Sequence, residues 1–329
     1  MPAKLDNLDY HLRFWDLAVF QILTEARSTT LAAERLGVTQ SAVSQSVSRL
    51  ERSFGTSLLD RSKRPLRTTH AGEVLSRDAA DILQALQRTQ NEVRVGSHNK
   101  VPIIRLGLVD SIATTAGPDI IRALTQTIEQ LRVWSGISPA LSSDLLARAL
   151  DLIVTDDPLT NHPEIDRECL FREPLLAAVP RGLVARFKGQ TLASMCAELP
   201  LIRPSQRSSF GRAVEYYLAQ RRLAVRGPVE FDAGEAMLKT VEAGIGWTIM
   251  TPLCLLQAHA DALDIAILPL PPPLSYRRVY VLSRPHELVH VTADVIRICR
   301  TCLEGTILPR LRALVPWAST ETGMEEMSP

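Results

Sequence analysis

The chain has 329 residues, of which 46% are hydrophobic and 22% are charged, with 37 basic against 36 acidic side chains. This composition is typical of a globular protein with sizeable cores, so it excludes collagen-like, disordered and small disulfide-stapled classes. At about 150 residues per domain, the length indicates two domains, with room for a third. The five cysteines are an odd number and thinly spread, as expected of a reducing compartment.

The N-terminal stretch and the apolar runs bear on location. No run of roughly 18 uncharged apolar residues exists, which excludes a membrane-spanning helix. Asp6, Asp9 and Asp16 interrupt the region where a signal peptide needs an unbroken apolar run. We therefore expect a cytoplasmic protein with no membrane partner.

The N-terminal third is predicted to be almost entirely helical, because apolar residues recur at helical spacing over residues 9–95. Gly37 ends one short helix, and Thr39 caps the next, which reaches about Phe54. Residues 61–69 carry no helical pattern and suit a short hairpin.

A long amphipathic stretch over 71–96 predicts a linker helix. Its apolar stripe consists of Val74, Leu75, Ala79, Ile82, Leu83 and Leu86. A stripe of this length favours a seam between two partner helices, with packing on its own domain as the alternative.

The C-terminal two thirds follow a polar stretch at 96–100. Short β-type runs then alternate with helical patterns, which predicts parallel sheets with helical crossovers. The tail over 316–329 is polar and is expected to be disordered.

The segment 29–48, TTLAAERLGVTQSAVSQSVS, meets the physical requirements of a helix-turn-helix. Ala32 and Ala33 let two helices cross closely, and Gly37 permits the turn. The face expected to point outward consists of Gln40, Ser41, Ser44, Gln45 and Ser48. These short side chains can reach base edges in a major groove, whereas a merely solvated αα-hairpin would more often carry Glu and Lys there.

A basic block supports the DNA-binding interpretation. Between Arg49 and Arg67 six basic residues stand against two acidic ones, although the whole chain is nearly neutral. Such a block is usually a solvated face, but beside a helix-turn-helix it is better explained as a phosphate-contacting footprint.

Three blocks of this region closely resemble the LysR-type transcriptional regulators: LRFWDLAVFQILTEARS, AAERLGVTQSAVSQSVSRLE and LLDRSKRPLRTTHAGEVL, in order and without gaps. Two positions depart from the family pattern. Ser41 stands where the family usually has proline, and Ser28-Thr29-Thr30 lacks the usual aromatic residue.

The resemblance implies an α plus α/β fold. A winged helix-turn-helix would span 9–70, a linker and dimerisation helix 71–96, and an effector-binding domain 101–312 that is similar to periplasmic solute-binding modules. Within the last, subdomain one would combine 101–172 with 290–312, and subdomain two would be 173–285, with a cleft between them.

The resemblance also implies which residues contact DNA. The positions that match the family's base and phosphate contacts are Thr39, Gln40, Ser41, Ser44, Gln45, Arg49, Arg64 and Arg67. The three arginines are expected on backbone phosphates, which give affinity but little sequence information.

Effector contacts are expected beyond the carboxyl ends of strands, where ligands bind in open α/β folds. The candidates are Asp110, Ser111, Ser135, Ser138, Arg203, Ser205, Arg207, Asp232, Met250 and Thr251. For any single serine, helix capping is the simpler explanation. Arg203 and Arg207 beside several hydroxyls predict an anionic effector. Asp110 would instead either pair with an arginine in the empty cleft or bind a polar or cationic group.

The function expected from these observations is ligand-responsive transcriptional regulation, not enzymatic catalysis. The protein would bind an interrupted dyad in double-stranded DNA as a dimer or tetramer, need no cofactor or metal, and respond to a small molecule. The resemblance leaves RNA polymerase open as a further partner.

Two short motifs offer rival interpretations. His286-Glu287-x-x-His290 matches the zinc metallopeptidase signature, but Pro285 and the following β-branched residues indicate a loop where that site needs a helix. Cys299 and Cys302 form a lone C-x-x-C, which is better explained as two buried helix cysteines than as a redox pair.

Overall fold

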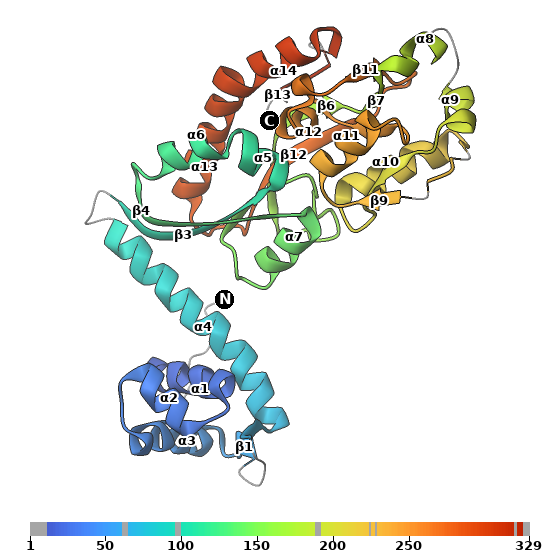
Figure 1. Ribbon diagram of the computed structural model, residues 1–329. Helices are drawn as coiled ribbons and strands as arrows, with labels where there is room; N and C mark the ends of the chain where they lie inside the picture. Colours follow the sequence, from blue (N-terminus) through green and yellow to red (C-terminus); the bar gives the residue numbers. More distant parts are fainter. Residues whose placement is uncertain are drawn as a thin grey trace. The chain divides into compact units, whose positions relative to one another are not determined.

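The computed structural model describes residues 12–60, 65–95, 100–187, 192–223, 225–227, 229–318 and 321–324. The chain divides into two compact units, residues 1–97 and 98–329, each of which has its own elements (Figure 1). Within the described ranges, no helix is long and apolar enough to cross a membrane.

The first unit is a helical domain with a small hairpin. Its elements are α1 (Phe14–Ala26), α2 (Thr29–Leu36), α3 (Gln40–Phe54), β1 (Leu59–Asp60), β2 (Arg67–Thr68) and α4 (His70–Val95). Leu17, Phe20, Leu23, Val43 and Leu50 are buried in one core, as their helical spacing predicts. β1 and β2 pair antiparallel, and β2 lies within the expected hairpin segment 61–69.

Glycines act at two points where the backbone favours a residue without a side chain. Gly37 ends α2 with a φ of 66°, in the left-handed region that other residues avoid. Gly72 lies so close to the hairpin that an added Cβ would stand 2.0 Å from the carbonyl oxygen of Leu58. These positions set how α2 turns into α3 and how α4 leaves the hairpin.

The described residues of the second unit form three sheets, and the first sheet has the order β13-β6-β12-β5-β3-β4. Its strands are β3 (Val101–Val109), β4 (Ile128–Gly136), β5 (Leu152–Thr155), β6 (Asp166–Pro174), β12 (Tyr276–Ser283) and β13 (Gly323–Met324). The helices that accompany it are α5 (Asp110–Thr115), α6 (Gly117–Leu124), α7 (Ser138–Leu146), α13 (Val289–Cys302) and α14 (Leu308–Leu314). Helices α6 and α13 share one core on one side of this sheet, and α7 packs against β5 in a separate one (Figure 1).

The second sheet has the order β10-β7-β11, and a parallel pair β8-β9 lies beside it. Its strands are β7 (Leu176–Pro180), β8 (Ile202–Pro204), β9 (Val229–Phe231), β10 (Thr248–Met250) and β11 (Ile265–Pro269). Its helices are α8 (Val184–Phe187), α9 (Leu192–Glu198), α10 (Ser209–Gln220), α11 (Gly234–Glu242) and α12 (Pro252–Gln257). Successive β7 side chains enter two different cores, which explains why that strand is apolar throughout.

Strand pairing differs from the expected all-parallel arrangement. β3 is parallel to β4 and β5, but β12 pairs antiparallel with β5 and β6, and the second sheet is antiparallel at every pairing found in it. β12 therefore belongs to the first sheet, so the predicted extent of subdomain two, 173–285, is too long at its C-terminal end. A short apolar run shows that a strand is buried, but it carries no information about which neighbour it pairs with.

Candidate functional site

The outward face of α3 carries uncharged hydrogen-bonding side chains. Thr39 caps the helix, because the backbone N–H of Ala42 donates to its Oγ1 over 3.2 Å. Gln40 donates through Nε2 to the Thr30 hydroxyl at 3.1 Å, and the hydroxyls of Thr39 and Ser41 lie 2.9 Å apart. Thr39, Gln40, Ser41, Ser44 and Gln45 are all exposed. Gln40, Ser41, Ser44 and Gln45 thus share one exposed face of α3, beside its cap Thr39.

Arg49 is placed differently from the other predicted DNA contacts. Its Nε and Nη2 donate to the two carboxylate oxygens of Asp16 over 2.9 and 2.6 Å, and Nη2 also donates to Ser46. Burial would raise the pKa of Asp16, but the hydrogen bonds from Arg49 and Ser46 outweigh it, so the pKa is lowered. The guanidinium therefore joins α3 to α1, and a phosphate contact would have to compete with this ion pair.

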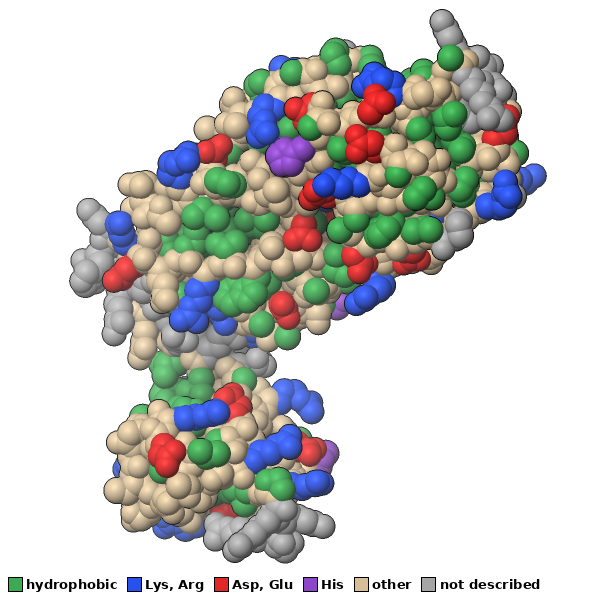
Figure 2. Space-filling model, in the orientation of Figure 1, with side chains coloured by type: hydrophobic (Ala, Val, Ile, Leu, Met, Phe, Trp, Pro, Cys, Tyr) green, Lys and Arg blue, Asp and Glu red, His purple; other side chains and the backbone are tan. Residues whose placement is uncertain are grey.

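The hairpin contributes Arg67, which is exposed on β2. The predicted contact Arg64 lies outside the described residues. Figure 2 shows basic and acidic side chains interspersed on the visible face of each unit. Arg67 is distinguished by its position on the hairpin that follows the helix-turn-helix.

The second unit contains a cavity of about 310 Å³ where its two sheet-containing halves meet. Of the predicted effector residues, the cavity is lined by Asp110, Ser111, Ser138, Ser205, Asp232 and Met250. Five of them follow β3, β4, β8 or β9, and Met250 is the last residue of β10. Strand ends from both halves therefore converge here, as the general rule for α/β folds predicts.

The other predicted effector residues lie outside that lining. Ser135 is exposed on β4, and Thr251 is fully buried and caps α12 through the N–H of Cys254. Arg203 forms an ion pair with Glu215 and donates to the carbonyl oxygen of Val225 at 3.0 Å.

Strand geometry explains the placement of Arg203. It is the middle residue of β8, so its side chain leaves on the opposite side from Ile202 and Pro204. The side chain of Arg207 is 77% exposed and its Nη1 lies 3.8 Å from Asp232. The prediction of an anionic effector depended on Arg203 and Arg207, and neither side chain lines the cavity.

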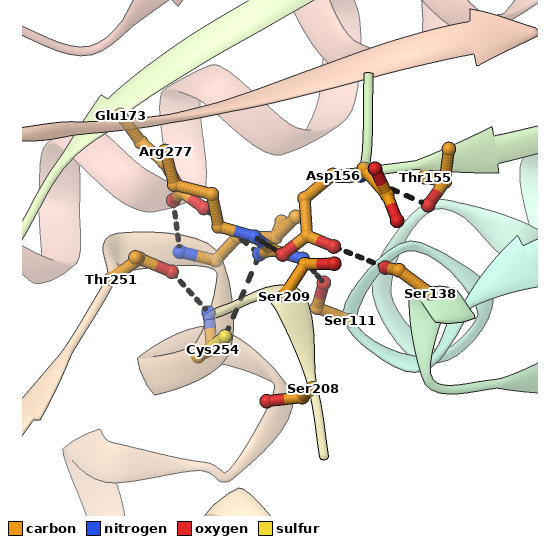
Figure 3. Close-up of polar contacts among 12 residues, drawn as sticks. Ser111, Ser138, Thr155, Asp156, Glu173, Ser208, Ser209, Thr251, Cys254 and Arg277 are labelled. Carbon is orange, nitrogen blue, oxygen red and sulfur yellow. Dashed lines mark hydrogen bonds and ion pairs between the residues drawn. The ribbon is translucent and has the colours of Figure 1, made fainter. Parts of the chain in front are cut away.

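A buried ion cluster that the sequence analysis missed forms one wall of the cavity (Figure 3). Arg277 on β12 donates through Nε to Asp156 at 2.8 Å, through Nη1 to Glu173 at 3.1 Å and through Nη2 to the Ser111 hydroxyl at 3.1 Å. Ser138 donates in turn to Asp156. Nothing in the sequence singles out Arg277, because Arg278 beside it is the same residue and faces solvent.

Burial and ion pairing act in opposite directions on the pKa values of the groups in this cluster. Burial would lower the pKa of Arg277, but the carboxylates of Asp156 and Glu173 outweigh it and the pKa is raised. Glu173 has no exposed surface, and burial raises its pKa despite Arg277 and a 2.7 Å hydrogen bond from the N–H of Leu253. Burial also raises the pKa of the Cys254 thiol, which accepts from Arg277 at 3.6 Å.

The metallopeptidase motif does not form the helix that it needs. His286 and Leu288 have φ values of 61° and 50°, so α13 begins only at Val289 and the two histidines do not share a helical turn. Glu287 is bound to Arg284 at 2.7 Å and to Arg148 at 2.9 Å. In the part of the chain that the structure describes, no group of three His, Cys, Asp or Glu side chains could hold a metal ion.

The C-x-x-C motif lies within α13, with both thiols free. Cys299 is buried, and burial with the neighbouring Cys302 raises its pKa to about 12. A thiol that resists ionisation is a poor nucleophile, which agrees with a packing role.

Each of the two units matches a model of a known protein family. Residues 14–73 match the bacterial regulatory helix-turn-helix of the lysR family, and residues 99–303 match the LysR substrate binding domain. The regulator CatR of Pseudomonas putida is 27% identical over 261 residues, which cover 77% of this chain and 86% of CatR.

Solved structures share the fold across most of the chain. Full-length OxyR from Pseudomonas aeruginosa has 22% identity and a TM-score of 0.65, covering 88% of this chain and 96% of that one. Full-length CbnR complexed with its target DNA has 23% identity and a TM-score of 0.60, covering 88% of this chain and 100% of that one. Because the two family models match more than half of the chain, it belongs to the LysR family of ligand-responsive, DNA-binding transcriptional regulators, which are not enzymes.

Proposed function

We propose that this regulator binds an interrupted dyad as a dimer or tetramer, reading bases with α3 and phosphates with the hairpin. The observation that carries the proposal is the exposed α3 face, where Gln40, Ser41, Ser44 and Gln45 stand without a carboxylate. Side chains of this kind can contact base edges without charge repulsion from the phosphates. The CbnR structure holds DNA on the same fold, which supports this use of the first unit.

The cavity of the second unit is the proposed effector site. Strand ends from both halves meet there, and Asp110, Ser138 and Ser205 line it. A small molecule that closes the halves together would alter how paired subunits present their recognition helices. It can shift DNA binding only as far as its affinities for the two states differ.

The test measures binding of the full chain to a DNA duplex with an interrupted dyad, by fluorescence anisotropy over a series of salt concentrations. Gln40→Ala and Gln45→Ala should each reduce discrimination between the dyad and a scrambled duplex by about tenfold, the value of one good base contact. Arg67→Ala should weaken binding to both duplexes and lower the salt slope by about one.

The matched control for Arg67→Ala is Arg212→Ala, which removes an exposed arginine from the second unit. It should leave the salt slope unchanged. If Arg67→Ala changed sequence preference and kept the salt slope, the assignment of Arg67 to phosphate would be wrong.

A further inference from the structure

We propose that the effector carries a cationic group, such as a protonated amine, on an apolar body. This inference rests on the proposed function, since it names the class of molecule that the cavity would take. The ionisable Asp, Glu and Arg side chains that line the cavity are Asp110, Asp156, Asp232, Glu235 and Arg277. Among the lining residues that the structure describes, one cation thus stands against four carboxylates.

Arg277, the one cation in the described lining, is not available to an anionic ligand. Arg277 is 6% exposed, and its guanidinium already donates to two carboxylates, Asp156 and Glu173, and to the Ser111 hydroxyl. An anion that approached it would have to displace one of these carboxylates or share its donors with it. Arg277 therefore closes the wall of the cavity and does not offer a free charge to its interior.

The acidic side chains differ in how far they are already neutralised. Asp156 is bound to Arg277, and Asp232 and Glu235 are largely exposed with Arg207 and Lys239 nearby, at 3.8 and 3.3 Å. The carboxylate of Asp110 is partly buried, and among the described residues it has no hydrogen-bond or ion-pair partner. This negatively charged carboxylate is therefore the lining group that a ligand can pair with, and the matching ligand group is a cation.

The remaining lining suits an apolar body with few polar points. Met237 and Met250 are buried in the wall, and Phe210 and Phe231 also line it. Aromatic faces attract a nearby cation as well as apolar groups, so they fit the same ligand. The volume, about 310 Å³, lies at the small end of ligand sites and suits a molecule of one ring or a short chain.

The experiment is titration calorimetry of the full chain at pH 7 with benzylamine, benzyl alcohol and benzoate, three probes of one size that differ in charge. Benzylamine should bind about tenfold more tightly than the alcohol, and benzoate should bind most weakly, because a charge-assisted hydrogen bond contributes roughly this factor. Asp110→Asn should lose about tenfold in benzylamine affinity and leave the alcohol unchanged. The control Asp261→Asn removes an exposed carboxylate outside the lining and should change none of the three.

Three results would overturn the inference: benzoate binding more tightly than benzylamine, no binding by any probe, or equal benzylamine affinity in Asp110→Asn and the parent. The comparison of the three probes on the parent needs no variant, so it still tests the inference if Asp110→Asn misfolds. DNA binding is measured on the same preparations. If the parent binds DNA sequence-specifically but prefers benzoate, this inference alone is overturned. If the parent shows no sequence-specific DNA binding, the proposed function is overturned.

Discussion

Asp16 and Arg49 form the tie that sets the recognition helix against α1. The Asp16 side chain is 3% exposed and that of Arg49 is 33% exposed, and two hydrogen bonds join them in parallel. This bidentate geometry fixes orientation as well as distance. Arg49 should therefore influence DNA binding through the position of α3 more than through a phosphate of its own.

We expect Asp16→Asn to destabilise the first unit by about 2 kcal/mol, the value of a hydrogen bond to a charged group. The folded-state pKa of Asp16 is lowered, so its contribution is present above the unfolded pKa, about 3.9, and is lost as pH falls through the folded pKa. The stability difference between parent and variant should thus be full at pH 7 and shrink below about pH 4. Calorimetric melting at both pH values measures it.

Glu34→Gln is the control for this change, because Glu34 is an exposed carboxylate on α2 of the same unit. It should alter the melting of the unit little at either pH. Equal effects of Glu34→Gln and Asp16→Asn would mean that the ion pair contributes nothing beyond surface charge.

At the scale of elements, the apolar stripe of α4 is partly buried in its own domain and partly exposed. Leu75 and Ala79 are buried in the core of the first unit and Leu83 packs against it, whereas Val74 and Ile82 are each 40% exposed. The exposed pair precedes Leu75 and Leu83 by one residue, which places it about 100° around the helix. Packing on its own domain, the alternative considered for the stripe, accounts for only part of it.

The exposed side of α4 is the side to test for dimerisation. Ile82→Glu should give a folded monomer at micromolar concentration, because a charge there prevents apolar contact with a second helix. Leu83→Glu should instead lower the stability of the first unit, since it brings a charge against its core. Size-exclusion chromatography with light scattering gives the mass, and a fully dimeric Ile82→Glu would remove this side of α4 from the interface.

At the scale of the whole molecule, two units with separate cores should lose stability separately. Arg277 tests this, because removing it leaves the carboxylates of Asp156 and Glu173 buried without their cation. Arg277→Met should destabilise the second unit by about 3–5 kcal/mol, the usual cost of breaking a buried pair. Melting of the first unit and its affinity for DNA should stay close to those of the parent.

Arg278→Met is the matched control, since the next residue of β12 points to the exposed side. Its effect on melting should be about 1 kcal/mol or less. If calorimetry gave equal shifts for both variants, or a single shared transition that both lowered, independent stability of the units would be refuted.

Local signals made much of this protein predictable. The helix-turn-helix follows from helical periodicity, a Thr39 cap and a left-handed Gly37, all of which act within one or two turns of chain. The convergence of Asp110, Ser111 and Ser138 on one cavity follows from their position after strands. Neither inference needs to know which distant residues meet.

Tertiary packing alone decided the partners of the charged groups and of one strand. Arg49 meets Asp16 from 33 positions away, and Arg277 meets Glu173 from 104. β12 pairs in the first sheet, although it follows the whole of the second along the chain. A side chain's partner depends on where the backbone returns after long excursions, and periodicity and residue type describe only its near neighbours. For this reason the sequence by itself determined the helix-turn-helix and the strand ends that line the cavity. The charge of the cavity lining depends on tertiary packing, which places Arg203 outside the cavity and Arg277 in its wall.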